Sequence, residues 1–375
     1  MIRRIYLDFI KDKISKREAD WIFKRGMQYF LIHASYLIQR PLCSPILGTF
    51  VTTYRCNYHC KMCDLPLRDR QLQRQGLKEL PTLQLKNLIK DFFDLGTSGI
   101  GFTGGEPLLR NDIFELLAYT KDMGMITHLN TNGFFLNEEN VKKLLQAGTD
   151  SINISLDGAR AQTHDTIRGY HGAFDKVINA IDCINLMRKK TGMPMRLKIV
   201  MVVNETNIDE VPDLVKLSCD LKTDCIEFIP QQPFFTLSEP VALYFNDNFL
   251  KKVENTVQYL VSLKKQGIKI ENSFRHLRLF AKSFKGDESP LICYAGYNSY
   301  AADCYGEIYP CMPWVNWGKS VGNIKDIPLK EFWYSSNYNK IRKDISKCRD
   351  CYLNCQAELN LLFNIISKLP LKTLS

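Results

Sequence analysis

Short apolar runs alternate with helix-length amphipathic stretches from Gly48 to about Leu237, and this alternation restricts the fold more than any other feature. Six runs have the length and composition of strands, at 48–54, 98–104, 126–133, 151–158, 195–204 and 225–230. The stretches between them have helical periodicity, at 82–95, 113–123, 138–147, 173–189 and 208–218. Strand–helix alternation with short glycine-containing turns is typical of a parallel sheet. We therefore predict an α/β fold, a partial (β/α)6 TIM-type barrel with its active site at the carboxyl ends of the strands.

The rest of the chain follows other patterns. A helix is predicted over 248–266, a hairpin over 300–311, irregular turns over 312–324 and a final apolar helix over 357–368. A loop-rich region with six cysteines has little regular core of its own, so we expect a metal cluster to hold it together. The predicted units are an N-terminal helical extension, the barrel, a linking helical segment, the cysteine-rich domain and a C-terminal helix or tail, at 1–45, 46–240, 241–285, 286–358 and 359–375.

Cysteine usage and charge limit the class of protein. The 375-residue chain has thirteen cysteines, no apolar secretion signal and no apolar run of about 20 residues, so we expect a cytoplasmic protein without a disulfide framework. The formal net charge is +10, but no dense basic run with interleaved aromatics indicates nucleic acid. A diffuse basic surface better fits an acidic protein partner, such as a small electron-transfer protein.

The first 45 residues form a basic amphipathic segment with nine Lys/Arg and four Asp/Glu. The favoured interpretation is a helical extension that packs on the main domain. The alternative is a helix that lies on an anionic membrane surface, at the inner face of the cell membrane. An apolar tail, Leu359–Leu369, is the other support for membrane contact.

Three cysteines form a C-x3-C-x2-C motif where the first predicted strand ends: Cys56, Cys60 and Cys63. Three thiolates on a short loop can hold three irons of a 4Fe–4S cube and leave the fourth iron open to a ligand. Zinc with a distant fourth ligand such as His59 is an alternative, and so are three unrelated free thiols. The x3 gap is unusual for zinc knuckles and favours the cluster.

This motif resembles the signature of the radical SAM superfamily, and the resemblance extends over about residues 46–235. Further matching segments follow the second, third and fourth strands in the order of that superfamily: TGGEP at 103–107, NTNG at 130–133, and SLDG at 155–158 with HD-x2-RG at 164–169. The resemblance implies that the three cysteines hold the catalytic 4Fe–4S cluster. It also implies that S-adenosylmethionine (SAM) contacts the side chains or backbone of Met62, Gly104, Gly105, Glu106, Asn130, Asn132, Ser155, Asp157 and Arg168.

The implied contacts have a physical basis. Two glycines allow a close backbone approach, and Glu106 offers acceptor oxygens to the amino group of methionine. Ser155 and Arg168 can hold the carboxylate, Arg168 as a forked donor. The alternative for Arg168 is a surface ion pair with Asp165. Met62 stands where the superfamily often has an aromatic residue, and its thioether can pack on adenine.

A second cysteine group resembles the auxiliary-cluster domains called SPASM and twitch. Its spacing is C-x12-G-x4-C followed by C-x2-C-x3-C, which is too short for the full SPASM pattern, so we expect one auxiliary cluster, 4Fe–4S in type. The expected ligands are Cys293, Cys311, Cys348 and Cys351, with Cys355 as a competing fourth ligand. Cys304, at the hairpin tip, is predicted to be free. A zinc site is the alternative from spacing alone. The remaining four are interpreted as small buried hydrophobes: Cys43, Cys183, Cys219 and Cys225.

The resemblance implies a reaction class. The reduced cluster cleaves SAM, and a hydrogen atom is then abstracted from a peptide, protein or small-molecule substrate, while the auxiliary cluster accepts an electron or binds the substrate. Reduction needs a one-electron donor such as flavodoxin or ferredoxin. The alternatives are a membrane-associated enzyme that modifies lipids and a non-catalytic metal-binding protein.

Overall fold

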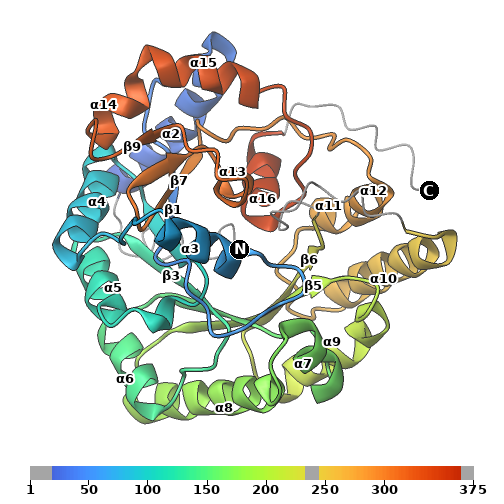
Figure 1. Cartoon of the computed structure of the whole chain (residues 1–375). Helices are drawn as coiled ribbons and strands as arrows, with labels where there is room; N and C mark the ends of the chain where they lie inside the picture. The colour runs from blue at the N-terminus through green and yellow to red at the C-terminus, as the bar shows by residue number, and fades with distance from the viewer. Residues whose placement is uncertain (1–18, 233–244, 365–375) are drawn as a thin grey trace.

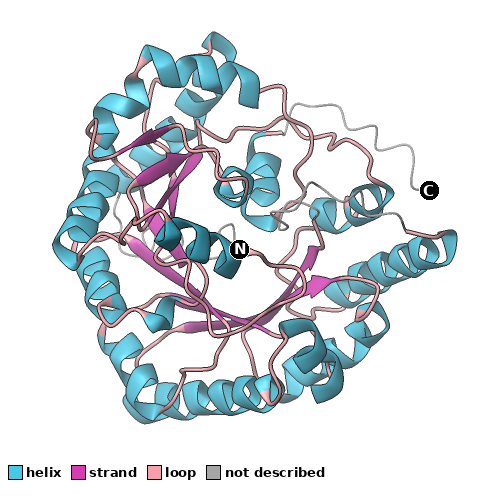
Figure 2. Cartoon of the chain, viewed as in Figure 1, coloured by secondary structure: helices cyan, strands magenta, loops and turns pink. Residues whose placement is uncertain are grey.

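The computed structural model describes residues 19–232 and 245–364 of the chain (Figure 1). Predictions for residues 1–18, 233–244 and 365–375 lie outside the described part. Within it, one twisted sheet curves around the centre of the molecule, and helices cover its outer surface (Figure 2).

The sheet has the strand order β6-β5-β4-β3-β2-β1-β7-β8-β9. The first six strands lie side by side in chain order, and every neighbouring pair among them is parallel. This confirms the predicted partial barrel. Their bounds are β1 Leu47–Val51, β2 Gly99–Thr103, β3 Ile126–Thr131, β4 Ser151–Ser155, β5 Arg196–Val203 and β6 Cys225–Pro230.

Successive side chains of these strands point alternately to the outer face of the sheet, under the helices, and to the inside of the barrel. Phe50 and Phe102 point outward and join the core under the helices, where they meet buried side chains such as Phe92. Thr103 and Ser155 point into the barrel and line a cavity there. The predicted crossover helices are α4 Thr82–Leu95, α5 Ile113–Asp122, α6 Glu138–Gln146, α8 Ala173–Thr191 and α9 Val211–Asp220, the last preceded by the 3-10 turn η2 Ile208–Glu210.

Within the barrel, three short helical elements were not predicted from the sequence: α3 Leu65–Arg74, η1 Pro107–Leu109 and α7 Ala161–Arg168. Each lies in a loop that leaves the carboxyl end of a barrel strand. Helices α3 and α7 carry mainly polar side chains, and η1 has only three residues, so none of them shows a clear apolar periodicity.

The C-terminal region extends the barrel sheet. Strand β7, Ser299–Asp303, pairs in parallel with β1, and β8, Glu307–Tyr309, returns antiparallel to it, which confirms the predicted hairpin. In this register, Val51 lies beside both Thr103 and Asp303. The loops that follow β1, β2 and β7 therefore start at the same edge of the sheet.

Helices fill most of the remaining C-terminal region. The prediction of irregular turns over 312–324 was wrong at both ends, because α13 Met312–Asn316 and the short strand β9 Gly322–Asn323 lie there. Five residues are too few for a helical period to be recognised in the sequence. The other elements are α10 Asp247–Lys265, α11 Phe274–Leu277, α12 Phe280–Lys285, α14 Leu329–Tyr334, α15 Ser336–Ile345 and α16 Asn354–Phe363.

The N-terminal helix α2, Ala19–Ile38, packs on the body of the protein, as the favoured interpretation predicted. Its Ile32 side chain is fully buried in a cluster with Tyr294, Tyr297 and Phe363. Helix α16 is almost entirely buried, so its leucines contribute to the protein core rather than to an exposed apolar tail. None of the described helices combines the length and hydrophobicity needed to cross a bilayer.

Candidate active site

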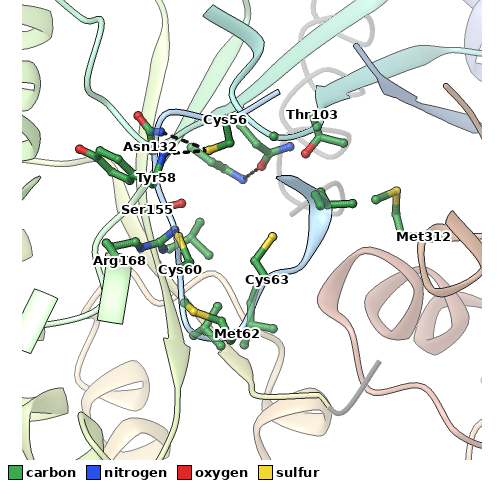
Figure 3. Close-up of a pocket in the computed structure, with 18 of the residues that line it drawn as sticks. Cys56, Tyr58, Cys60, Met62, Cys63, Thr103, Asn132, Ser155, Arg168 and Met312 are labelled. Carbon is green, nitrogen blue, oxygen red and sulfur yellow. Dashed lines mark hydrogen bonds between the residues drawn. The ribbon is translucent and has the colours of Figure 1, made fainter. Parts of the chain in front are cut away.

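The three cysteines of the C-x3-C-x2-C motif line one cavity of about 270 Å³ at the carboxyl ends of the barrel strands. In Figure 3, the Cys60 and Cys63 side chains point into the space between their loop and the strands. Burial raises the pKa of Cys56 to about 11 and that of Cys63 to about 12, so the metal-free thiols are protonated at neutral pH. Iron must displace these protons when a cluster is assembled.

A neighbouring turn fixes the shape of this cysteine loop. The backbone N–H of Lys61 donates to the Ile167 carbonyl at 3.0 Å, and the Tyr58 ring stacks on Tyr170 at 4.9 Å between centroids. Gly169 has a φ of +63°, and a Cβ there would lie 2.3 Å from the His59 carbonyl oxygen. The end of α7 is therefore in direct backbone contact with the cysteine loop. Because these contacts join distant segments, sequence reasoning did not find the role of Tyr170.

The two glycines of TGGEP bring the loop after β2 against the loop after β1. A Cβ on Gly104 would lie 2.2 Å from the Thr53 carbonyl oxygen, and one on Gly105 would lie 2.1 Å from the Arg55 carbonyl oxygen. The Gly105 N–H also donates to the Thr53 carbonyl at 2.8 Å. Both glycines line the cavity, so their lack of side chains serves loop packing as well as access for a ligand.

Glu106 is fully buried beneath this loop and is not among the cavity-lining residues. Its carboxylate accepts hydrogen bonds from the Thr131 hydroxyl at 2.8 Å, the Asn132 N–H at 2.7 Å and the Leu108 N–H at 3.1 Å. Burial raises the pKa of Glu106 to about 7, against the opposing effect of these donors. Its direct contact with the amino group of SAM stays a prediction, while its hydrogen bonds join the loops after β2 and β3.

Arg168 enters the cavity from the end of α7. Its guanidinium forms an ion pair of 2.6 Å with Asp157, and another of its N–H groups lies 3.8 Å from the Cys60 sulfur. Asp157 is fully buried and also accepts from the Val202 N–H at 2.7 Å, so it orients Arg168. The alternative pairing with Asp165 was wrong, because the Asp165 carboxylate accepts backbone N–H groups instead.

The other predicted SAM contacts lie on the same cavity wall: Met62, Asn130, Asn132 and Ser155. The Asn132 amide donates to Asn57 at 2.8 Å and lies 4.0 Å from the Cys56 sulfur. Sequence reasoning missed several lining residues, namely Asn153, Val200, Val202, Gln231, Gln232, Met312, Asn316 and Leu353. The alternation along β4 and β5 contained a signal for the first three, but no local pattern indicated the C-terminal ones.

These residues fit a cluster with one open iron that binds SAM. Three thiols face one cavity, and the buried Nε of Arg168 has no hydrogen-bond partner among the described residues. In the described part of the chain, no three His, Cys, Asp or Glu side chains converge tightly enough for a single metal ion. A cube of four irons is wider than one ion, so thiols that stand further apart suit it.

The second cysteine group also comes together. Cys293, Cys311 and Cys348 pack in one cluster with Ala295 and Ile345. The pKa of the Cys351 thiol is raised well above its usual range, first by burial and then by the nearby thiols of Cys355, Cys311 and Cys293. The pKa of Cys311 is raised in the same way, with Cys293, Cys348 and Cys355 nearby. All five candidate thiols therefore lie near one another. Which four of the five would hold a cluster stays a prediction.

The other cysteines lie apart from both groups. Cys304 is fully buried, and the charged groups that affect its pKa are those of Asp303, Glu79 and Arg110 rather than other thiols. Cys225 is buried, as expected for a small hydrophobe. The same interpretation was wrong for Cys219, which is exposed on α9. The sequence predicted a helix at this position but did not show that the Cys219 side chain lies on the solvent-exposed face of α9.

Comparison with known proteins places two families on the chain. The model of the Radical SAM superfamily matches residues 50–218, and that of SPASM, an iron–sulfur cluster-binding domain, matches residues 293–352. The chain is 27% identical over 320 residues to an AdoMet-dependent heme synthase of Methanosarcina barkeri, covering 80% of this chain and 85% of the relative.

Solved structures share the fold at lower identity. SuiB of Streptococcus suis matches with a TM-score of 0.65 and 18% identity, over 90% of this chain and 79% of its own. SuiB bound to its precursor peptide SuiA gives 0.63 and 17%, over 93% and 84%. The enzyme anSMEcpe with bound AdoMet and a peptide gives 0.59 and 20%, over 81% and 84%.

Proposed function

Because the chain is a radical SAM enzyme with a C-terminal SPASM domain, we propose that it cleaves SAM reductively and abstracts a hydrogen atom from a substrate held between the two domains. The SAM-binding 4Fe–4S cluster supplies the one-electron chemistry, and the SPASM domain carries auxiliary iron–sulfur chemistry.

One observation carries it. The cavity that contains the thiols of Cys56, Cys60 and Cys63 is also lined by Met312, within the residues that match SPASM, and by Leu353, directly after them. In Figure 3, Met312 lies on the opposite side of the pocket from Arg168. A substrate in this space therefore contacts both domains, and its reacting carbon can lie close to bound SAM.

In this proposal, side chains of the protein bind SAM and orient it in the cavity. Arg168, held by Asp157, presents an unpartnered N–H to the carboxylate of SAM. Asn130 and Asn132 offer amide groups on the cavity wall, and Met62 offers an apolar surface for the adenine ring. The mostly apolar remainder of the wall excludes water from a reactive intermediate.

Two substrate classes remain in the proposal. Modification of a peptide or protein is the first, and it rests on likeness of fold to SuiB and anSMEcpe. Oxidation of a small molecule is the second, and the heme synthase, the more similar relative in sequence, favours it. Modification of a lipid has less support, because Leu359 and Leu361 of the apolar tail are buried.

Deuterium transfer distinguishes the classes without knowledge of the substrate. Cells that contain the enzyme's natural substrate are grown in deuterated medium, and their extract is separated into peptide and small-molecule fractions. The reconstituted enzyme is then supplied with SAM, reductant and each fraction. Deuterium in the 5′-deoxyadenosine formed with one fraction identifies the class. Transfer from neither fraction, while SAM is still cleaved, would contradict hydrogen abstraction.

We also propose that an acidic flavodoxin- or ferredoxin-like protein supplies the electron, since the chain has a formal net charge of +10. Salt screens such docking, with a Debye length of about 8 Å at physiological ionic strength. SAM cleavage driven by the protein donor should slow as salt rises, whereas cleavage driven by dithionite should change much less. Equal salt responses would refute electrostatic docking.

A further inference from the structure

Helix α2 has an exposed apolar face that is separate from the active site. Phe23, Met27, Phe30 and Leu37 follow one another at spacings of four, three and seven residues, and their side chains are 68%, 44%, 68% and 79% exposed. This spacing places them in one stripe about 100° wide. Ile38 extends the stripe. Large apolar side chains that lie exposed side by side on a protein surface are typical of an interaction site.

The opposite face of α2 is firmly attached to the barrel. Gln28 donates to the carbonyls of Ser44 and Pro45 at 2.9 and 3.2 Å, just before β1 begins. On the same side, the Tyr29 ring stacks on Phe363 at 4.9 Å. The helix thus has one packed face and one solvent-facing face, and its exposed stripe is not an unpaired part of the protein core.

The stripe also lies away from the catalytic cavity. Helix α2 contacts the segments that enter β1 and β2, where Arg25 donates to the Gly96 carbonyl at 3.2 Å. These segments are at the amino ends of the strands, whereas the cavity is at their carboxyl ends. In Figure 1, α2 lies behind the strands and α3, which follows the cysteine loop, lies in front of them.

Basic residues outnumber acidic ones in and around α2. Residues 19–42 contain Lys24, Arg25 and Arg40 and one acidic residue, Asp20, and Arg25 is on the face that contacts the barrel. The sequence that precedes α2, residues 1–18, adds six Lys/Arg against three Asp/Glu. Helix α16 ends beside α2, where Tyr29 donates to the Leu362 carbonyl at 2.8 Å, and residues 365–375 after it have two lysines and no acid.

We propose that α2 docks the enzyme on an anionic lipid bilayer, with its axis parallel to the membrane surface. An aromatic and aliphatic stripe flanked by Lys and Arg fits the boundary between headgroups and acyl chains, and the positive charge fits anionic headgroups. An acidic protein or a second copy of the chain would match the charge or the apolar stripe, but the bilayer matches both over the full helix length. In this orientation, the cavity opens away from the membrane.

Vesicle flotation with the full-length, cluster-reconstituted enzyme tests the proposal. Vesicles of phosphatidylglycerol and phosphatidylcholine are compared with vesicles of phosphatidylcholine alone. We expect at least tenfold tighter binding to the anionic vesicles, and at least tenfold weaker binding by the Phe23→Ser/Phe30→Ser variant. The matched control is Leu83→Ser/Phe93→Ser on α4, whose replaced side chains are 71% and 45% exposed and which should bind like the wild type.

Each outcome decides the question. Absence of wild-type binding to anionic vesicles overturns the proposal, and so does unchanged binding by the Phe23→Ser/Phe30→Ser variant. A wild-type dimer that becomes monomeric in this variant, without vesicle binding, assigns the stripe to a second copy. SAM cleavage should be equal in all variants, which separates this proposal from the proposed function. If the double variant does not fold, the single variant Leu37→Ser replaces it.

Discussion

At the scale of single residues, the site depends on the close approach of two backbone segments. Gly104 and Gly105 hold the loop after β2 so near the cysteine loop that any Cβ would overlap a carbonyl oxygen. Strain of this kind costs about 1–3 kcal/mol when a side chain is forced in. The cysteine loop must then move relative to the residues that are predicted to bind SAM.

We therefore expect Gly105→Ala to weaken SAM binding by roughly 10- to 100-fold, as the strain energy implies. Gly101→Ala on β2, the strand that precedes this loop, is the matched control, because a Cβ there has only one neighbour, at 4.0 Å. Equilibrium binding of SAM to the reconstituted proteins measures both. Wild-type affinity in Gly105→Ala would show that the two loops tolerate separation and that the glycines do not set the site geometry.

The buried pair of Arg168 and Asp157 makes a second prediction at this scale. Asp157→Asn removes the negative charge and leaves the guanidinium buried without its partner, so Arg168 loses its orientation. SAM affinity should fall about tenfold or more, which corresponds to about 1.4 kcal/mol. Arg168→Lys should behave similarly, since an ammonium cannot form the same fork.

The control for this pair is Asp213→Asn, which breaks an exposed ion pair with Arg160 on the surface of the barrel. Iron content measured on the same samples distinguishes lost SAM binding from lost cluster. SAM affinity that is unchanged in both Asp157→Asn and Arg168→Lys would remove the pair from the site.

At the scale of helices and strands, the sequence predicted the barrel well. The α4 helix begins and ends where its periodicity predicted, and each of the six strands lies within or almost within its predicted range. The helices have a buried face and an exposed face, so their helical period can be recognised in the sequence. The strands are buried on both faces and therefore appear as short apolar runs. The short helices α3, α7 and α13 escaped prediction because their positions depend on tertiary contacts, such as that of α7 with the cysteine loop.

The inside of the barrel contains a polar pair that the sequence did not indicate. Lys198 on β5 and Glu227 on β6 form a buried ion pair, and the Asn354 amide donates to Glu227 at 2.7 Å. In spite of burial, the positive charge of Lys198 holds the pKa of Glu227 well below its usual range. Two charges so far apart in sequence become a pair only when the strands are aligned.

We expect Glu227→Gln or Lys198→Met alone to lower the free energy of unfolding by about 3 kcal/mol, because each leaves an uncompensated buried charge. The double variant should lose less than the sum of the two. Urea denaturation followed by tryptophan fluorescence measures this coupling, and Lys252→Met, which breaks an exposed pair with Asp209, should have a much smaller effect. Strict additivity of the two changes would show that they do not interact.

At the scale of the whole molecule, a shared sheet joins the two domains. Because β7 pairs with β1, the loop that follows each of them starts at the same edge. Tyr54 and Tyr309, each two residues before a predicted cluster cysteine, both donate to Asp303, at 2.8 and 2.9 Å. The cysteine spacing predicted two cluster sites, but it did not show that Met312 and Leu353, which are close in sequence to cysteines of the second group, line the cavity of the first group.

Two separate clusters should therefore be found. The reconstituted enzyme should contain about eight irons if both groups hold 4Fe–4S cubes. Replacing Cys56, Cys60 and Cys63 with Ala should leave about four irons, held by the C-terminal cysteines. Cys43→Ala/Cys219→Ala is the matched control and should keep the full iron content. A folded triple variant with no iron at all would refute the two-site arrangement.

The most direct test of the central claim separates SAM cleavage from product formation. Anaerobic assays of 5′-deoxyadenosine under reduction are run with the wild type, the Cys56→Ala/Cys60→Ala/Cys63→Ala variant and the Cys348→Ala/Cys351→Ala variant. We predict that the wild type forms deoxyadenosine, that the first variant forms none, and that the second still forms it slowly but yields no modified substrate. Deoxyadenosine formation by the variant without Cys56, Cys60 and Cys63 would contradict the assignment of the catalytic cluster.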